Sequence, residues 1–549
     1  MGAILFPRYM TRRLGELILL MLVACGAWAQ PEYSSVGETI YRRGVLPSGE
    51  PLRGSRGPGA QAEGEGAACF NCHRRSGLGT AEGRIVIPPI TGKYLYRPDR
   101  DKLEDLDLRY VQSYKLNREP YADDAAVARA IRDGIGKGGK ELNYLMPRYD
   151  LDDAAMASLI AYLKVLSKDR PPGVTDDTLH FSTIITPDAD PVRRQGMLAV
   201  LQQLFSDKNE FIHGGNRTIQ SSREIAYRVK RRWQLHVWEL AGAPDTWEAQ
   251  LRKKQDAEPV FAVISGVGGQ TWEPVHRFCQ QAAIPCLFPN VDLPVVAESD
   301  FYPVYFSKGV LLEAQMIAAR LDESRQTSAL RRVIQVFRGG DMGEQAAGAL
   351  TAAMAGSPIQ NVNQMIGSSA GSKELAAALH GAGAGDAVVL WLRPEDIAML
   401  PVKPVSTAEV YLSGLMAGME SAPLSAAWRG TTRMAYPADL PEQRKFRMNF
   451  PLGWFRVKHI PVVAEQVQAD TYLACGILSE TLGEMLDSFV GDYLEERLED
   501  MLSRRTITGY YPRLGLAPRQ RFASKGGYIV RFAEPTGARV VADSDWIVP

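Results

Sequence analysis

Cys69-Phe70-Asn71-Cys72-His73 is the stretch from which the organisation of the chain follows. Two cysteines three positions apart, with a histidine directly after them, form the attachment pattern of c-type haem. The thiols of Cys69 and Cys72 can bond to the two porphyrin vinyl groups, which places the His73 imidazole under the iron as an axial ligand. The stretch therefore predicts one covalent haem c.

Three other interpretations of the same residues are weaker. A zinc site needs a second ligand pair, but the chain has no second C-x-x-C and its other six histidines stand alone: His180, His213, His236, His276, His380 and His459. A thioredoxin-like pair follows a strand, whereas the Gly-rich run 54–66 precedes Cys69. A disulfide between Cys69 and Cys72 would be strained at this spacing. We therefore favour haem, and we interpret the isolated histidines as structural or surface residues.

Length and composition limit the remaining possibilities. A chain of 549 residues predicts two to four domains, and an apolar content of 45% is enough to form sizeable cores. Lys plus Arg equals Asp plus Glu at 63 each, so the overall charge gives no indication of binding to nucleic acid or to an anionic membrane surface. Six cysteines are too few for a disulfide scaffold.

The N-terminus predicts export. Residues 1–29 carry three arginines, then the apolar run Leu17–Ala24 and the triplet Ala27-Trp28-Ala29, whose two alanines form a small-residue cleavage site. This is the pattern of a secretory signal cleaved before Gln30. The segment around Cys25 also resembles a lipobox, in which this cysteine would be lipidated, and the sequence leaves that alternative open. No later stretch is apolar enough to cross a membrane. We expect a periplasmic protein with no transmembrane segment in its mature chain.

A methionine is the best candidate for the sixth iron ligand. Met146 lies in a loop that Pro147 stiffens, just before a predicted amphipathic helix, 152–167. Methionine opposite histidine raises the haem potential and closes the iron to small molecules, which is an electron-transfer design. Most methionines only fill cores, but this one follows a haem motif and precedes a terminal helix.

Residues 32–168 resemble class I cytochrome c, an all-α fold. The matching positions are Gly37 and Tyr41 in an N-terminal helix, Cys69-x-x-Cys72-His73, Pro88-x-Ile90-x-Gly92, Met146-Pro147, and Tyr162 in the final helix. The resemblance implies that the first and last helices cross near Gly37 and Tyr162. It also implies that the Pro88 carbonyl accepts a hydrogen bond from Nδ1 of His73. The loop between Gly44 and Cys69 is longer than in compact members, which leaves the exposure of the haem edge undecided.

Residues 169–177 contain adjacent prolines and no apolar anchor, which is typical of a linker. From residue 178, strand-like and helix-like runs alternate, which predicts two lobes with parallel α/β sheets. The expected strands are His180–Thr186, Phe261–Ser265, Ile284–Phe288, Arg332–Phe337 and Ala387–Leu392. The expected helices are Val192–Phe205, Glu273–Ala283, Gly309–Leu321, Gly343–Ala355, and one or two within Val462–Leu502.

Residues 178–549 resemble the type 1 periplasmic binding proteins, the Leu/Ile/Val-type substrate-binding proteins of ABC transporters. The resemblance is carried by four segments: Phe261–Gly269, Ala283–Pro289, Tyr305–Gly309 and Arg332–Asp341. It implies that a small molecule binds between the lobes and that its carboxylate accepts hydrogen bonds from backbone N–H groups and hydroxyls at helix N-termini. The corresponding positions are Gly268, Gly269, Gln270 and Thr271 in one lobe and Asp341 and Glu344 in the other.

This binding site departs from the family pattern. Amino-acid binders place small hydroxyl residues where this chain has Gly-Gly-Gln-Thr-Trp, ending at Trp272. The alternative is that these residues only terminate strands and cap helices, because a fold can persist without its ligand. Cys279 and Cys286 lie across a predicted helix-to-strand turn, and the sequence does not decide whether they are bridged. Cys475, in an apolar helix, is expected to be a buried small hydrophobe.

Two functional hypotheses follow. The first is an exported electron carrier, not an enzyme, that accepts an electron from a periplasmic redox partner such as a dehydrogenase; its second domain would serve for docking or for coupling a ligand to redox state. Filled axial positions argue against an oxidase or peroxidase. The second is a small-molecule receptor or sensor with an accessory haem, in which lobe closure alters the surface offered to a partner. The predicted architecture is the same for both: an all-α cytochrome c domain followed by a two-lobed α/β domain.

Overall fold

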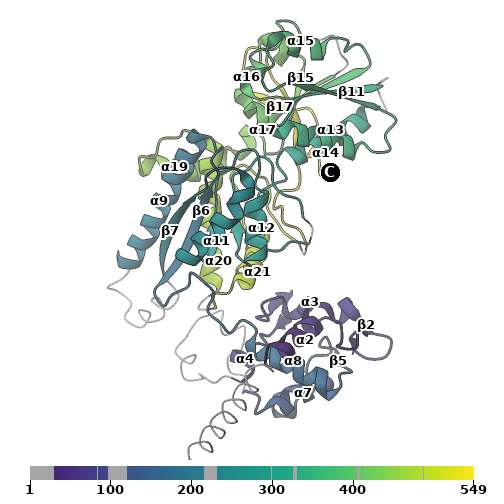
Figure 1. The fold of residues 1–549 in the computed structure, drawn as a ribbon, viewed down its shortest axis with the longest axis vertical. Coiled ribbons are helices and arrows are strands. Elements are labelled where there is room, and N and C mark those ends of the chain that lie inside the picture. The colour runs from purple at the N-terminus through teal and green to yellow at the C-terminus, as the bar shows by residue number, and fades with distance from the viewer. Residues whose placement is uncertain are drawn as a thin grey trace, which may run out of the picture. The chain divides into compact units, whose positions relative to one another are not determined.

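A computed structural model describes nine ranges of the chain: 30–82, 85–96, 120–214, 231–297, 299–325, 330–404, 409–485, 488–517 and 519–549. The expected signal segment 1–29, with Cys25, lies outside the described residues. The chain divides into two compact units, Met1–Arg170 and Pro171–Pro549 (Figure 1). This division falls inside the segment 169–177, for which the sequence predicts a linker.

Helices form most of the regular structure described in the first unit, but the unit also contains short strands and so is not all-α as the sequence predicts. Its α-helices are α2 (Gln30–Arg43), α3 (Phe70–His73), α4 (Gly92–Tyr96), α7 (Asp124–Arg132) and α8 (Asp153–Val165). The long loop before the haem motif contributes the strands β1 (Arg53–Ser55) and β2 (Gln61–Glu63), and β5 (Arg148–Tyr149) pairs antiparallel with β1. Two further short strands, β3 (Thr80–Glu82) and β4 (Ile85–Ile87), form a second antiparallel pair.

The β1–β2 hairpin has a local cause. Gly57 and Gly59 adopt φ values of 129° and 77°, which side-chain-bearing residues rarely adopt. The chain therefore reverses over a few residues, and the N–H of Arg56 donates to the carbonyl of Ala60 at 2.9 Å. A Gly-rich run that sequence analysis treats as a loop thus folds into a small sheet.

Helices α2 and α8 cross closely, as the resemblance implies. A Cβ placed on Gly37 would lie 2.1 Å from the carbonyl oxygen of Ser158 and 2.6 Å from Cβ of Tyr162, so only glycine allows this approach. The rings of Tyr41 and Tyr162 pack beside the crossing with centroids 5.4 Å apart. Asp152 caps α8 by accepting a hydrogen bond from the N–H of Ala155 at 2.7 Å.

The second unit has two α/β lobes, which confirms the predicted fold class for this part of the chain. The first lobe has a parallel sheet in the order β10-β9-β8-β6-β7. Its strands are β6 (Thr178–Ile185), β7 (Arg232–Glu239), β8 (Ala262–Ile264), β9 (Cys286–Leu287) and β10 (Pro303–Val304). Its helices are α9 (Pro191–Gly214), α11 (Trp247–Ala257), α12 (Glu273–Gln281), α19 (Pro441–Val457), α20 (Glu465–Met485) and α21 (Gly491–Arg504).

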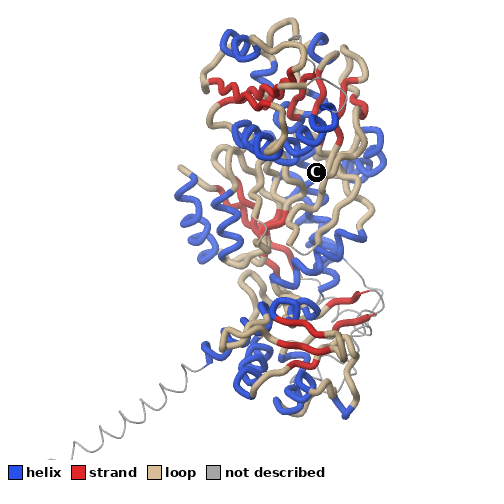
Figure 2. The backbone as a smooth tube through the Cα atoms, turned by 90° about the vertical axis from the view of Figure 1, so that its right-hand side faces the viewer, coloured by secondary structure: helices blue, strands red, loops and turns tan. Residues whose placement is uncertain are grey.

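The second lobe has a sheet in the order β12-β11-β13-β14-β15-β16-β17, parallel as far as β15 and antiparallel after it. Its strands are β11 (Arg332–Arg338), β12 (Gln360–Ile366), β13 (Asp386–Trp391), β14 (Glu409–Ser413), β15 (Thr432–Tyr436), β16 (Tyr528–Phe532) and β17 (Val540–Ala542). Its α-helices are α13 (Val310–Arg325), α14 (Met342–Ala353), α15 (Ser372–Leu379), α16 (Pro394–Ile397), α17 (Gly414–Ala417) and α18 (Ala426–Arg429). Figure 2 shows the helices and strands of both lobes.

The chain crosses between the lobes three times, after β10, after β15 and before β16. The first and third crossings pair with each other, because the N–H of Tyr305 donates to Arg521 and the N–H of Ala523 donates to Tyr305, each at 2.9 Å. The second crossing joins the same region through the N–H of Asp439, which donates to the carbonyl of Tyr510 at 2.8 Å. These paired segments border the space between the lobes.

Candidate functional site

The haem motif forms a short helix in the structure. Cys69 precedes α3, and the N–H of His73 donates to the carbonyl of Cys69 at 2.9 Å. Arg74 then ends the helix at φ 64°. Cys69 and His73 are buried and Cys72 is half-buried. Both cysteines are unbridged thiols, which is the state that addition to two vinyl groups requires.

The ring of His73 is held in one orientation and one tautomer. Its Nδ1 lies 3.0 Å from the carbonyl oxygen of Pro88. Since a carbonyl can only accept, Nδ1 carries the proton and Nε2 keeps its lone pair. Burial lowers the pKa of His73 to about 4, against the opposing effect of the Pro88 hydrogen bond. The ring is therefore neutral at pH 7, as an iron ligand must be.

The five residues that the sequence singles out for the haem site meet in one cavity. Cys69, Cys72, His73, Pro88 and Met146 all line a cavity of about 930 Å³ in the first unit. Much of the remaining lining is apolar, including Leu95, Val127, Ile131, Leu142, Leu159 and Leu163. Ligand sites typically enclose roughly 300–1,000 Å³. The volume, the apolar wall and the donor set of one imidazole, one thioether and two thiols fit a haem c.

The loop that carries Met146 is held by hydrogen bonds from the side chain of Arg148 to its backbone carbonyls. One terminal nitrogen of Arg148 donates to the carbonyl of Met146, and the other donates to the carbonyl of Leu142 at 3.3 Å. Gly134, at φ 70°, leaves room for this guanidinium, because a Cβ there would lie 1.7 Å from Nε of Arg148. Sequence analysis did not single out Arg148, although it directly follows Met146-Pro147.

The six predicted ligand residues of the second unit lie where strands end and helices begin. Several of them form hydrogen bonds with one another or with neighbouring residues. The amide of Gln270 donates to Oδ1 of Asp341 at 2.9 Å, which links the two lobes. The backbone N–H of Gln270 donates to Oδ2 of Asp188 at 2.7 Å, and the N–H of Gly269 donates to Thr186 at 3.2 Å. Oγ1 of Thr271 accepts from the N–H of Glu273 at 3.3 Å.

Asp341 and Glu344 serve helix α14. Asp341 accepts from the N–H of Met342 at 2.8 Å and forms a two-point ion pair with Arg393 at 2.7 and 2.8 Å. Burial alone would raise the pKa of Asp341, but the hydrogen bonds from Arg393 and Gln270 hold it below its usual value. Glu344 accepts from the N–H of Gly340 at 2.9 Å, and Gly268 packs against the ring of Trp272. The capping and strand-ending roles weighed as the alternative are thus present in the structure.

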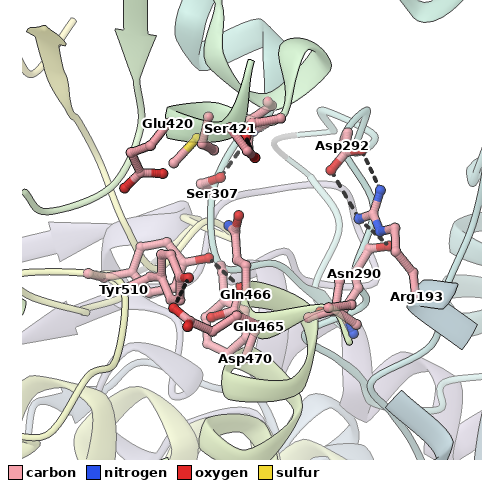
Figure 3. A pocket seen from close by; sticks show the side chains of 18 of the residues that line it. Arg193, Asn290, Asp292, Ser307, Glu420, Ser421, Glu465, Gln466, Asp470 and Tyr510 are labelled. Atoms are coloured by element: carbon pink, nitrogen blue, oxygen red, sulfur yellow. Dashed lines mark hydrogen bonds and ion pairs between the residues drawn. The ribbon is translucent and has the colours of Figure 1, made fainter. Parts of the chain in front are cut away.

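A second cavity lies between the lobes and includes none of these six residues. It has a volume of about 720 Å³ and is lined by α20, by the crossing segments and by loops of both lobes (Figure 3). Its polar residues include Arg193, Asp292, Glu420, Glu465, Gln466 and Asp470. This site was not predicted from the sequence. One signal was available: Asp470 is the single charged residue within the stretch 466–479 of α20.

Several of the remaining cysteines and histidines are buried or hydrogen-bonded in the second unit. Cys279 and Cys286 are both buried and unbridged, and burial together with the neighbouring Cys286 thiol raises the pKa of Cys279. Cys475 is buried among apolar residues, as expected. Nδ1 of His180 lies 3.0 Å from Nε2 of His236, and His276 bonds to Tyr305 and Asp300 at 2.8 and 2.7 Å. The side chain of His213 lies outside the described residues.

The described ranges contain no group of three or more His, Cys, Asp or Glu side chains that could hold a metal ion. None of the helices in that part of the chain is both long and apolar enough to cross a membrane.

No family model and no curated protein matches the chain. Similar solved structures include a fatty acid ABC transporter substrate-binding protein from Thermomonospora curvata, with 14% identity, a TM-score of 0.45, and coverage of 69% of this chain and 95% of that one. A possible leucine/isoleucine/valine-binding protein from Rhodopirellula baltica SH 1 has 14% identity, a TM-score of 0.47, and coverage of 67% and 97%. A branched-chain amino acid ABC transporter protein from Thermus thermophilus with bound valine has 10% identity, a TM-score of 0.47, and coverage of 69% and 97%.

Proposed function

We propose that the chain is an exported c-type cytochrome that carries one covalent haem and transfers electrons, joined to a two-lobed module that serves for docking or for coupling a ligand to redox state. The observation that carries the haem assignment is the meeting of Cys69, Cys72, His73, Pro88 and Met146 in one cavity. These residues lie up to 77 positions apart in the sequence, yet they supply every donor that a haem c needs.

Each residue has a defined task in this proposal. Cys69 and Cys72 would hold the porphyrin through thioether bonds, and His73 and Met146 would be the axial ligands. Haem iron ligated in this way cycles between the ferric and ferrous states without an open coordination position. The Pro88 carbonyl fixes the tautomer of His73, and Arg148 holds the backbone of Met146. The electron donor would be a periplasmic redox partner, such as a dehydrogenase, and export depends on the N-terminal signal.

The attachment is tested by producing the full chain in a host that attaches haem c and measuring the absorption spectrum after denaturation in alkaline pyridine. We expect one covalent haem per chain. The double variant Cys69→Ser/Cys72→Ser should lose it entirely. Cys475→Ser removes a buried thiol from the second unit and should keep it. Haem that stays bound to the double variant after denaturation would refute the attachment.

A second function, a solute receptor with an accessory haem, is favoured by the cavity between the lobes. It predicts that a small molecule binds the full chain, and that binding shifts the reduction potential or the affinity for a partner. An electron carrier that uses the lobes only for docking predicts no such ligand. A thermal-shift screen of the full chain against amines, amino acids, carboxylic acids, alcohols and sugars separates the two, since a ligand stabilises the folded state by mass action.

A further inference from the structure

The cavity between the lobes contains a carboxyl oxygen that lacks a partner. Asp470 is 5% exposed and lies on the cavity wall in α20 (Figure 3). Its Oδ2 accepts a hydrogen bond from the hydroxyl of Tyr511 at 3.1 Å. Its Oδ1 accepts none from the residues that the structure describes. A buried acceptor without a donor costs free energy, so this oxygen is a place where a ligand that donates gains affinity.

The two arginines nearest to this wall are already neutralised. Arg193 donates to both carboxylate oxygens of Asp292, at 2.6 and 3.1 Å. Arg444 donates to Glu420 at 2.9 Å, and its guanidinium lies 4.1 Å from the ring centre of Tyr510. A third arginine of the lining, Arg539, is exposed. The cavity therefore offers no unengaged buried guanidinium to a carboxylate ligand.

Acidic groups exceed basic ones along the same wall. The lining contains five carboxylates, Asp292, Glu420, Glu442, Glu465 and Asp470, against the three arginines. Glu465 accepts a hydrogen bond from the hydroxyl of Tyr510 at 2.7 Å through one of its two carboxylate oxygens. Burial raises the pKa of Asp470 to about 7, although Tyr511, Gln466 and the charges of Arg193 and Arg444 act against this rise. A cation beside Asp470 would favour its ionised form.

Aromatic rings complete the site. Phe306 and Tyr511 stack with ring centres 5.2 Å apart, and both line the cavity together with Tyr510. The exposed edges of rings of this kind pack well against an apolar ligand body. The wall thus combines an acceptor that lacks a donor, a surplus of carboxylates and an aromatic surface.

We propose that this cavity binds a small organic ammonium ion, with an ammonium N–H donating to Oδ1 of Asp470 and the apolar body packing on Phe306, Tyr510 and Tyr511. The proposal rests on the receptor role proposed above for the second unit, and it names the class of molecule received. Gln466 also lines the cavity, and Figure 3 shows its side chain beside Glu465 and Asp470.

Isothermal titration of the full haem-loaded chain with three compounds of one shape tests this proposal: benzylammonium chloride, benzyl alcohol and sodium benzoate. Benzylammonium should bind at least about 10-fold more tightly than the alcohol, because hydrogen bonds to charged groups are stronger, and benzoate should bind most weakly. Asp470→Asn should weaken benzylammonium binding about 10- to 100-fold. Glu480→Gln, ten residues later on the same helix, exposed and not part of the cavity lining, should leave it unchanged.

Several outcomes would overturn the proposal: benzoate or benzyl alcohol binding as tightly as the amine, Asp470→Asn binding benzylammonium unchanged, or no binding of any of the three. Tyr511→Phe leaves Oδ1 untouched and should keep the preference for the amine. If Asp470→Asn does not fold, as judged by its melting curve, the order of affinities on the unaltered chain decides. If a sugar or a carboxylate stabilised the chain instead, the assignment of the ligand as an ammonium ion would be refuted, but the receptor function would still be supported. If no compound in the thermal-shift screen stabilised the chain, both the ammonium site and the receptor function would be refuted. The haem spectrum would be unaffected by that result.

Discussion

The two cavities of this protein differ in how the sequence encodes them. Three of the five residues of the proposed haem site lie within Cys69–His73; the other two are Pro88, in a proline motif, and Met146, before a helix. The lining of the cavity between the lobes is collected from positions 193 to 540, from both lobes and from the crossing segments. A site whose chemistry is concentrated in one motif can be recognised before the fold is known, whereas a site assembled by the fold cannot.

The cavities also differ in charge. In the first, the proposed iron ligand His73 has a lowered pKa and is neutral, and much of the wall is apolar. In the second, the central group is an acid whose pKa is raised, surrounded by ion pairs. The first suits a large apolar group held by a few donors, and the second suits a small polar molecule. Substitutions in the two units test this difference.

Replacing Met146 should change the first cavity most. Met146→Ala removes the only proposed ligand on the face of the iron opposite His73, so we expect the ferrous protein to change from no binding of carbon monoxide to stoichiometric binding. The reduction potential should also fall, because a methionine ligand raises it. Absorption spectra with and without carbon monoxide measure the first effect, and a redox titration measures the second.

Met156→Leu is the matched control. Met156 is buried in α8, only ten positions away, and a swap of similar volume typically costs less than about 1.5 kcal/mol. It should leave the spectrum unaltered. If Met146→Ala kept a closed iron as well, another residue would be the ligand, and the first site would be less local than proposed.

The helix crossing beneath the first cavity is the next point to test. In Gly37→Ala, the added methyl would lie 2.1 Å from a backbone oxygen of Ser158, so α2 and α8 must move apart. We expect the free energy of unfolding to fall by about 1–3 kcal/mol, although the helix propensity of alanine is more favourable than that of glycine by about 1 kcal/mol. Thermal unfolding monitored at the haem band measures the loss. Gly66→Ala, where a new Cβ meets nothing within 4 Å, should change stability little; equal effects of the two changes would contradict the close crossing.

The second unit should show a pH dependence that comes from a buried acid. Glu313 is 0% exposed, and burial raises its pKa to about 8, despite hydrogen bonds from Ser413 and the N–H of Leu415. The folded state therefore holds this proton more tightly than the unfolded state, whose pKa is near 4.5. The contribution to stability is full below pH 4.5 and is lost as the pH rises toward 8, by up to about 1.4 kcal/mol per unit.

Glu313→Gln cannot ionise, so the variant should gain stability relative to the wild type as the pH rises from 5 to 8. Urea unfolding of the full chain, followed by tryptophan fluorescence at several pH values, measures this difference. Glu323→Gln, on the same helix with a mostly exposed side chain, should show no such trend. Parallel curves for Glu313→Gln and the wild type would mean that Glu313 is ionised when folded.

These regions also show how far the sequence could predict the structure. The strands β6, β11 and β13 were predicted to within two residues, because buried parallel strands are continuous apolar runs bounded by turn signals. The antiparallel strands β16 and β17 were missed, since residues 528–542 contain charged and turn residues and acquire their pairing from β15, almost a hundred positions earlier. Asp470 was missed for the same reason, because its role depends on Tyr511 and on a wall formed by distant segments.

The smallest expected effect tests whether the haem site is as local as its motif. Arg148 holds the carbonyls of Met146 and Leu142 with two branches of one guanidinium, and a lysine has no such fork. In Arg148→Lys we expect the ferric iron to bind cyanide about five-fold faster, which corresponds to one net hydrogen bond of about 1 kcal/mol lost from the loop. Arg129→Lys, at an exposed position of α7, should leave the rate unaltered. A rate in Arg148→Lys equal to that of the wild type would show that Met146-Pro147 positions the sulfur alone. A rise would mean that the second ligand also depends on a contact that no haem motif records.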